Sequence, residues 1–307
     1  MNGSSSEKFT PQVFDRKAQR DHRDRASRRF ADHDFLFRMG AERLTDRLLD
    51  IKRQFPQALD LGCRGGSVAG ALAGSSNFGI TQLIQADISS AMAVRAYQSY
   101  SHPTIVCDEE LLPFRSESFD LILSNLSLHW VNDLPGSLIQ IRQSLRPDGL
   151  FCASLFGAGT LSELRDVFLE AEMDLKSGVS LRVSPFAEVR DLGGLLQRAG
   201  FSLPVVDTDK ITVTFTDVFQ LMADLRGMGE TNAIFDRQKT FTGREIFAKA
   251  AALYAQRYGM EDGRIPASFH VITLTAWAPH ASQPKPLRRG SATASLADAL
   301  DDRKNKI

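Results

Sequence analysis

The sequence predicts an α/β fold built on a doubly wound, mostly parallel sheet of seven strands. Between residues 56 and 155, short apolar runs alternate with helix-compatible segments, a pattern that indicates parallel βαβ units. The run at 57–61 enters a cluster of glycines and then small helix-forming residues, which is the strand–turn–helix order of a nucleotide-binding edge. A length of 307 residues allows one or two domains with an ample core.

The segment before the sheet has the composition of helices. We expect two or three helices between Phe14 and Phe55, and we treat residues 1–55 as an N-terminal helical extension. Arginine and aspartate alternate along its first part, which favours a solvated helix surface with local ion pairs.

The first half of the sheet follows in a regular order. We expect strands at 57–61, 82–86, 103–107, 119–124 and 149–155, with helices at 66–73, 89–99 and 134–145. Pro147 and Gly149 end the last of these helices and allow the turn into the fifth strand.

The second half of the sheet carries helices between its strands. Thr160 and Glu163 have the spacing of a capping box at a helix start, and a second helix at 187–198 stops at Gly200. Strands at 204–208 and 211–216, a helical insertion at about 218–262 and a last, antiparallel strand at 268–277 complete the pattern. The main domain then spans 56–280, and the polar residues 281–307 are expected to form a flexible tail.

Composition excludes several classes of protein. Hydrophobic residues make up 43% and charged residues 24% of the chain, as in ordinary globular proteins. Lys+Arg and Asp+Glu both number 37, so no bulk field attracts nucleic acid. The widely spaced Cys63, Cys107 and Cys152 are expected to be free thiols in a reducing compartment. No apolar run approaches the roughly 20 residues of a transmembrane helix, so we expect a cytoplasmic protein that at most associates with a membrane peripherally.

The glycine turn is the centre of the predicted site. A dinucleotide fingerprint counted from Gly62 needs glycine at the positions of Arg64 and Ser67, and no Gly-Lys-Ser/Thr of a P-loop ends the turn. An ordinary βα loop is the alternative for the turn alone. Asp87, at the end of the second strand, strengthens the nucleotide interpretation because a carboxylate accepts hydrogen bonds from both hydroxyls of a ribose.

The Asp-x-Gly-x-x-x-Gly arrangement from Asp60 to Gly66 resembles motif I of the class I S-adenosylmethionine (SAM) methyltransferases, which have a Rossmann-like fold. The peptides 108–123 and 145–151 resemble later motifs of that family, in the same order. The resemblance implies SAM as the cofactor. It implies the cofactor-binding residues Asp60, Gly62, Cys63, Gly65, Gly66, Asp87, Ile88, Asp108, Glu109 and Ser124.

One residue departs from the family pattern. Arg64 stands where the family has a glycine that lies against the cofactor. Its side chain either crowds the ligand, or Gly65 takes over through a small change of the turn.

Four further peptides, at 14–16, 126–135, 225–232 and 289–293, are similar to the methyltransferase-fold arginine hydroxylases that assemble respiratory complex I. This resemblance implies hydroxylation of an arginine in a matrix-arm subunit, on the matrix side of mitochondria or in the cytoplasm of a bacterium. A more distant resemblance is to malonyl-acyl-carrier-protein O-methyltransferase, which implies methyl transfer to a carboxylate. A third hypothesis is a non-catalytic SAM-binding assembly chaperone.

The substrate side of the site is expected at the end of the fourth strand, with Asn125, His129 and Trp130. His129 either acts as a base or substrate contact or only packs at a helix start, so no catalytic residue is assigned. His22 and Asp24 have the spacing of two iron ligands but lie in the charged helix, and no metal is expected. Hydroxylation is implied by resemblance alone, since the residues show no redox centre.

Overall fold

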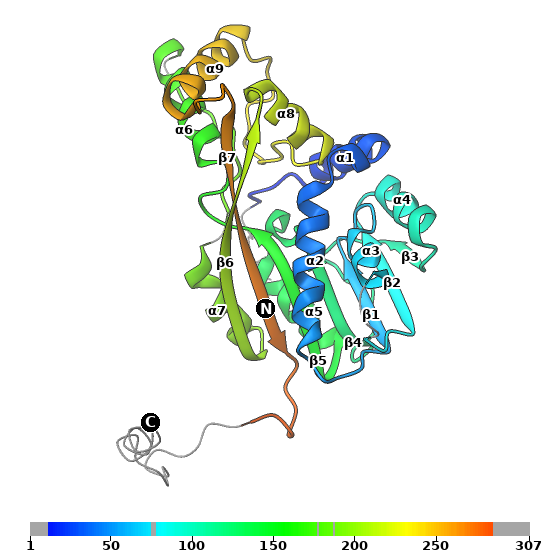
Figure 1. Cartoon of the computed structure of the whole chain (residues 1–307). Coiled ribbons are helices and arrows are strands. Elements are labelled where there is room, and N and C mark those ends of the chain that lie inside the picture. The colour runs from blue at the N-terminus through cyan, green and yellow to red at the C-terminus, as the bar shows by residue number, and fades with distance from the viewer. Residues whose placement is uncertain (1–11, 75–77, 177, 187, 285–307) are drawn as a thin grey trace, which may run out of the picture.

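A computed structural model describes residues 12–74, 78–176, 178–186 and 188–284 and has one seven-stranded sheet in the order β3-β2-β1-β4-β5-β7-β6 (Figure 1). The first five strands pair in parallel, and β7 runs antiparallel between β5 and β6. This confirms the predicted doubly wound, mostly parallel sheet. The strands are β1 (Gln57–Leu61), β2 (Gln82–Asp87), β3 (Thr104–Val106), β4 (Phe119–Asn125), β5 (Leu145–Phe156), β6 (Ser202–Phe215) and β7 (Ile265–Trp277).

Helices cover both faces of this sheet because successive side chains of a strand point to opposite faces. Leu123 of β4 shares a buried cluster with Leu44 of α2, whereas its neighbour Ile122 shares one with Leu138 of α5 and Leu192 of α7. A strand buried on both faces is typical of parallel sheets and explains the continuous apolar runs of the sequence. These helices are α2 (Phe35–Leu49), α3 (Ser67–Ala73), α4 (Ser90–Tyr100), α5 (Leu134–Ser144) and α7 (Val189–Arg198).

A helical cap lies beyond one end of the sheet. The long strands β6 and β7 extend past their neighbours and meet helices α6, α8 and α9 there (Figure 1). Phe168, Leu221, Ala250 and Phe269 belong to the buried cluster that joins these helices to β7. The insertion therefore has the two predicted helices, and the cap consists of α6 (Ser162–Leu175), α8 (Val218–Gly227) and α9 (Arg244–Tyr258).

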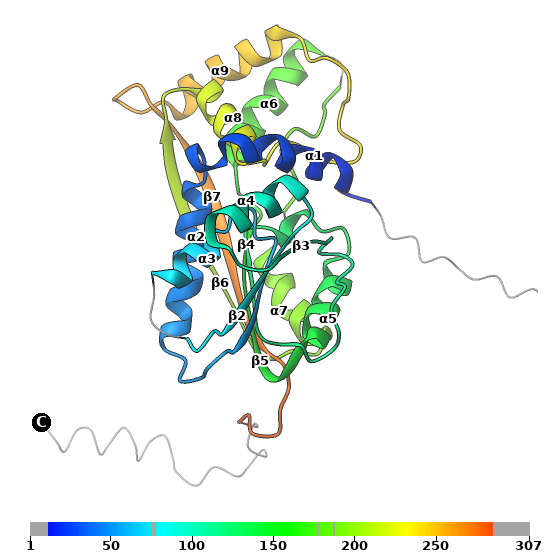
Figure 2. The ribbon, with the colours of Figure 1, turned by 90° about the vertical axis from the view of Figure 1, so that its right-hand side faces the viewer.

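The N-terminal segment crosses between the sheet and the cap. Figure 2 shows α1 running horizontally between α4 below and α6, α8 and α9 above. Asp15 caps α1 by accepting a hydrogen bond from the Ala18 amide at 3.0 Å, and its own amide donates to Ala233 of the insertion. The segment comprises α1 (Arg16–Ala26) and the 3₁₀ helix η1 (Ser27–Asp32), followed by α2.

Three details of the prediction were wrong. Pro147 and Gly149 do not end the helix or form the turn before the fifth strand, because α5 ends at Ser144 and β5 already begins at Leu145. Thr160 does not cap α6, which begins at Ser162, because its hydroxyl bonds the backbone of His270 instead and Glu163 accepts from Ser268. The two strands expected at 204–208 and 211–216 are one strand, β6, because it pairs continuously with β7 from Val205 onward.

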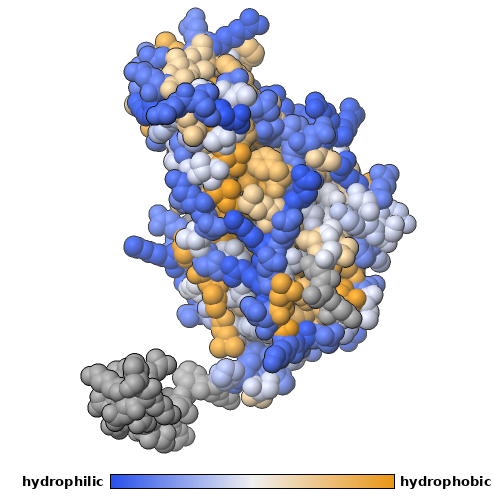
Figure 3. All heavy atoms as spheres, in the orientation of Figure 1, coloured by the Kyte–Doolittle hydropathy of each residue, from blue (hydrophilic) through white to orange (hydrophobic). Residues whose placement is uncertain are grey.

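The molecular surface is largely polar on the face shown in Figure 3, with apolar patches between the charged groups. Within the described ranges, the three cysteines are buried free thiols, as expected. Among the same residues, no helix is both long and apolar enough to cross a membrane. Residues 285–307, most of the predicted flexible tail, lie outside the described part of the chain, as does the peptide 289–293.

Candidate functional site

Acidic side chains gather at the carboxyl ends of three neighbouring strands. Asp60 is the next-to-last residue of β1, Asp87 is the last residue of β2, and Asp108 and Glu109 follow β3. Parallel neighbours finish at the same edge of a sheet, so the fold brings these predicted residues together. Asp60, Asp87 and Glu109 are fully buried there, with no exposed surface.

Two arginines of α1 neutralise this acidic edge. The Nη1 of Arg23 lies 3.1 Å from Asp87 Oδ2 and 3.2 Å from Glu109 Oε1, and all three side chains are fully buried. Arg16, two helical turns earlier, pairs with Asp108 and Glu109. The interpretation of α1 as a solvated surface with local ion pairs was therefore wrong for this face. Its arginines form ion pairs with acidic residues far away in the sequence.

Burial and charge set the pKa values at this edge. Burial raises the pKa of Glu109, but Arg16 and Arg23 outweigh it and hold the pKa well below its usual range. Asp60 has no such partner, and burial together with the charge of Asp87 raises its pKa to about 8. Both carboxylate oxygens of Asp60 are buried without a hydrogen-bond partner among the described residues.

The glycine turn packs against side chains of the same chain. Gly62 has φ +76°, and a Cβ on it would lie 2.1 Å from the Ser127 hydroxyl. Gly65 approaches the Phe30 ring, where a Cβ would lie at 2.8 Å. Gly66, with φ +86°, is the N-cap of α3. Glycine is required at these positions by close packing and by the left-handed backbone.

The remaining predicted cofactor residues are buried around this turn. Cys63 is buried, and burial raises the pKa of its thiol well above the usual value. Ile88 follows Asp87 and is 7% exposed. Ser124 donates from its hydroxyl to the Leu61 carbonyl at 2.8 Å, so it holds β4 to β1.

The carboxylates of this edge suit a cofactor that carries hydroxyl groups and a positive charge, because carboxylates accept hydrogen bonds and attract cations. Asp87 and Glu109 act as paired acceptors, and Asp60 contributes a buried acid without a partner. In this structure the guanidinium of Arg23 lies between Asp87 and Glu109. Arg23 therefore competes with any ligand that uses Oδ2 of Asp87.

Asn125, His129 and Trp130 lie together at the end of β4 but face different surroundings. The amide of Asn125 donates to the Phe37 carbonyl at 2.7 Å and accepts from Ser154 at 2.8 Å. These bonds tie Asn125 into the core between α2 and β5. It was expected in the substrate pocket, and its contacts instead indicate a structural role.

Glu230, in the loop after α8, connects the other two residues. Its Oε2 accepts from Trp130 Nε1 at 2.9 Å and lies 3.1 Å from His129 Nε2. Burial raises the pKa of Glu230, but the buried cation Arg64 and then His129 lower it to about 2. Burial lowers the pKa of His129, against the opposing effect of Glu230, and its Nε2 contact helps to orient the carboxylate.

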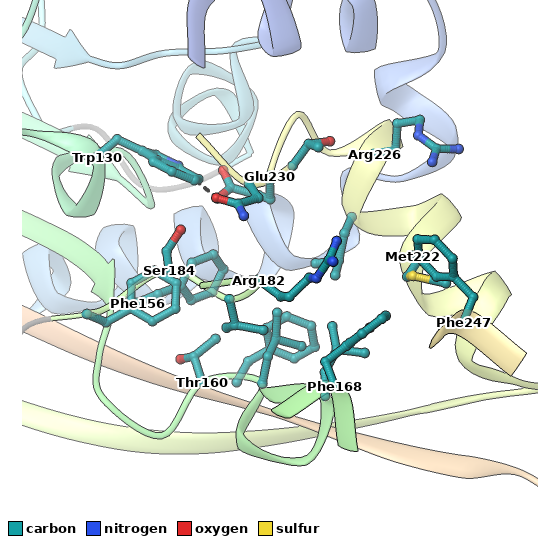
Figure 4. Close-up of a pocket in the computed structure, with 18 residues that line it drawn as sticks. Trp130, Phe156, Thr160, Phe168, Arg182, Ser184, Met222, Arg226, Glu230 and Phe247 are labelled. Atoms are coloured by element: carbon teal, nitrogen blue, oxygen red, sulfur yellow. Dashed lines mark hydrogen bonds between the residues drawn. The ribbon is translucent and has the colours of Figure 1, made fainter. Parts of the chain in front are cut away.

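An apolar cavity of about 240 Å³ lies beside this group, between the sheet and the cap. Figure 4 shows Trp130 and Glu230 together at one end and Met222 and Phe247 at the other. Apolar side chains, chiefly phenylalanines and leucines, form most of the wall. Trp130 lies in the wall of this cavity, whereas Asn125 and His129 do not line it.

Arg16, Arg23 and Glu230 were missed as site residues. The spacing of Arg16 and Arg23, seven residues or two helical turns, was the available signal, since it places both on one face of a helix. Glu230 lies in the peptide 225–232 that marked the family resemblance, but nothing in that peptide singles it out, and only its contacts with His129 and Trp130 reveal its role.

Known proteins share this architecture. The Methyltransferase domain family matches residues 59–153. The YcgJ protein of Bacillus subtilis superposes with a TM-score of 0.53 at 16% identity, covering 77% of this chain and 98% of that one. Phosphoethanolamine N-methyltransferase 2 of Haemonchus contortus, solved in complex with SAM, gives 0.53 at 17% identity, covering 85% and 60%. The sheet order and these matches define a protein of the class I methyltransferase fold.

More similar sequences narrow this class. Mitochondrial arginine-hydroxylase NDUFAF5 of Homo sapiens is 43% identical over 300 residues, covering 96% of this chain and 85% of the relative. The Danio rerio protein of the same name is 42% identical, covering 93% and 89%. The malonyl-acyl-carrier-protein O-methyltransferase of Xylella fastidiosa is 41% identical over 189 residues, covering 62% and 61%. The chain belongs to the family of the NDUFAF5 arginine-hydroxylases, which confirms the resemblance seen in its motifs.

Proposed function

We propose that this protein binds SAM and hydroxylates an arginine of a matrix-arm subunit during the assembly of complex I. The observation that carries the proposal is Glu230, whose side chain is only 4% exposed and lies in the wall of a cavity that is mainly apolar apart from Arg182 and Arg226. A cavity with a carboxylate at one end and apolar walls suits an arginine side chain, which carries a charged guanidinium on an aliphatic stem. The family supports the same activity, since its named members are arginine-hydroxylases.

The cofactor proposal rests on the acidic edge. Asp87 would hold the ribose hydroxyls, Asp60 and the turn from Gly62 to Gly66 would hold the methionine part, and Asp108 and Glu109 would lie near the base. SAM supplies a sulfonium with a transferable methyl group when bound. The residues of the chain bind, orient and exclude water, which is the main contribution of an enzyme to a displacement reaction.

Hydroxylation replaces a C–H bond by C–OH and removes two electrons from the substrate. With dioxygen as the oxidant, one oxygen atom enters the C–OH group and the other leaves as water, with two electrons from a reductant in a cell extract. The proposed contribution of the chain is the binding and alignment of the arginine. Trp130 and His129 hold Glu230, and Glu230 takes the substrate charge.

The decisive experiment is mass spectrometry of the arginine substrate. Purified protein, SAM and the matrix-arm subunit of the same organism would be incubated in air with a cell extract as the source of reductant. We expect one added oxygen atom on one arginine, and its loss with Glu230→Gln. Unmodified arginine with every source of reductant would contradict the proposal.

Methyl transfer to malonyl-acyl-carrier protein is the second candidate. Arg182 and Arg226 line the same cavity and would suit a carboxylate substrate. Labelled methyl on the carrier protein would favour this candidate. A third outcome, complex I assembly that persists after Asp60→Asn or Asp87→Asn, would favour a non-catalytic assembly chaperone.

We further propose the division into a helical extension at 1–55, a main domain at 56–280 with its insertion at about 218–262, and a tail at 281–307. The expected location is the cytoplasm for a bacterial chain and the matrix side for a mitochondrial one. The vertebrate relatives named above support the second part.

A further inference from the structure

Arg64 is a buried cation whose guanidinium reaches from the glycine turn to Glu230, a residue of the cavity wall. Its Nη1 donates to the Met228 carbonyl at 3.1 Å and its Nη2 to the Leu126 carbonyl at 3.2 Å. Nη2 also pairs with Glu230 Oε1, and Cζ lies 4.5 Å from the centre of the Phe37 ring. A carboxylate, two carbonyls and an aromatic face together form a receptor for a planar guanidinium.

Three features of Arg64 oppose its placement in this receptor. Arg64 has φ +48°, a left-handed conformation that a residue with a Cβ adopts with strain. Its Nε is buried without a hydrogen-bond partner among the described residues. Burial, followed by the like charge of Arg23, lowers the pKa of Arg64 to about 10. Each of these features weakens the hold of the site on Arg64, so another guanidinium can compete for the carboxylate.

The carboxylate of this receptor also faces the cavity. Glu230 and Trp130 form part of the cavity wall, and Figure 4 shows the hydrogen bond between them. Trp130 and His129 both contact Oε2, which fixes the carboxylate and leaves Oε1 for a cation. A side chain that enters the cavity therefore meets a preoriented carboxylate.

The geometry points to Glu230 as the binding residue for the guanidinium of the substrate arginine, with Arg64 as an internal stand-in that the substrate displaces. The identity of the substrate side chain rests on the proposed function. Trp130 and His129 are positioning residues, because they act on the substrate through Glu230. The binding step forms and breaks no covalent bond.

Removing the stand-in tests this inference. Arg64→Gly empties the receptor and suits the positive φ of that position. We expect calorimetric titration with ethylguanidinium chloride to give about tenfold tighter binding to Arg64→Gly than to the wild type, as for a site that its own chain fills about nine-tenths of the time. Ethylammonium chloride has the same charge without the planar fork, and it should bind more weakly than ethylguanidinium.

Two further variants distinguish binding at this receptor from a general effect of removing a positive charge. Arg64→Gly combined with Glu230→Gln should lose the gain in ethylguanidinium binding. Arg115→Gly removes an arginine from an exposed loop and should bind like the wild type. Equal affinity of wild type and Arg64→Gly for ethylguanidinium would overturn the inference, as would equal binding of ethylammonium. If Arg64→Gly does not fold, Arg64→Lys keeps the charge and should still give tighter ethylguanidinium binding than the wild type.

The inference and the proposed function fail in different ways. Ethylguanidinium that binds at Glu230, together with arginine substrates that never gain oxygen, would contradict the proposed function alone. Arginine hydroxylation by the wild type, with an unchanged KM for the arginine substrate in Arg64→Gly, would contradict the inference alone.

Discussion

Asp60 and Asp87 lie at neighbouring strand ends but are stabilised in opposite ways. Asp87 accepts from Arg23, from the backbone amide of Arg64 at 3.0 Å and from the amide of Ser89 at 2.8 Å. Asp60 is equally buried and has no hydrogen-bond partner within the described chain. A buried carboxyl without partners favours its neutral form, so Asp60 takes up a proton more readily than an exposed aspartate does.

This difference predicts a pH dependence of stability. The pKa of Asp60 rises from about 4 in the unfolded chain to about 8 in the folded protein, so folding favours the protonated form. The stabilising contribution is complete below pH about 4 and is lost as the pH rises through about 8. We expect the unfolding free energy, measured by urea titration without cofactor, to fall less over this interval in Asp60→Asn than in the wild type. Parallel pH profiles of the two proteins would contradict the assignment.

Arg23 forms buried ion pairs with Asp87 and Glu109, so its removal leaves both carboxylates without this cation. Breaking a buried ion pair on one side costs about 3–5 kcal/mol. We expect Arg23→Gln to lower the unfolding free energy by an amount of that order, measured by urea titration at neutral pH. Arg29→Gln is the matched control, because Arg29 forms an exposed pair with Asp32 and should change stability little. Equal stability of the two variants would exclude a stabilising role for Arg23.

At the scale of elements, α8 places the loop that carries Glu230. The helix starts at the cap Asp217, whose side chain accepts from the amides of Phe219 at 2.7 Å and Gln220 at 2.9 Å. Its other end contacts the glycine turn, since Arg64 donates to the Met228 carbonyl. The N-terminal cap of α8 therefore influences the substrate side of the site.

Loss of this cap should act on stability and on α8 together. We expect Asp217→Ala to lower the unfolding free energy by about 1 kcal/mol, the usual cost of an aspartate cap, and to speed amide exchange in the first turn of α8. Asp236→Ala, at an exposed position of the same insertion, should leave both unchanged. Hydrogen exchange with mass spectrometry measures the local effect. Unchanged exchange in α8 would show that packing, rather than the cap, holds the helix.

At the scale of the whole molecule, α1 separates the acidic edge of the sheet from the cap (Figure 2). Its arginines Arg16 and Arg23 occupy the carboxylates that the fold offers to a cofactor. Cofactor binding and the position of α1 are therefore coupled, because both use Asp87.

This coupling predicts the effect of SAM on dynamics. We expect SAM to bind in calorimetric titration, Asp87→Asn to abolish binding, and amide exchange in α1 to become faster when SAM is present. Helices α5 and α7, on the other face of the sheet, serve as the internal control and should not change. Slower exchange in α1 would mean that the helix closes over SAM with Arg23 still in place. Absence of SAM binding, recovered in Arg64→Gly, would favour the chaperone hypothesis.

The sequence by itself determined the order of the strands and helices and the acidic ends of β1 and β2. These features are local: apolar runs, glycines and the acids that follow them need only neighbouring residues to be recognised. The resemblance of the motifs to the family could be recognised from the sequence for the same reason. The boundaries of β6 and the start of α6 could not be predicted from the sequence, because pairing with β7 overrides local turn and cap signals.

The tertiary structure alone decided which charges meet. Arg23 pairs with Asp87 and Glu109, and Arg64 pairs with Glu230, across separations that no sequence pattern marks. The physical reason is burial: a charge without water requires a counter-charge, and only the packing of α1 and of the loop after α8 onto the sheet determines which acid supplies it.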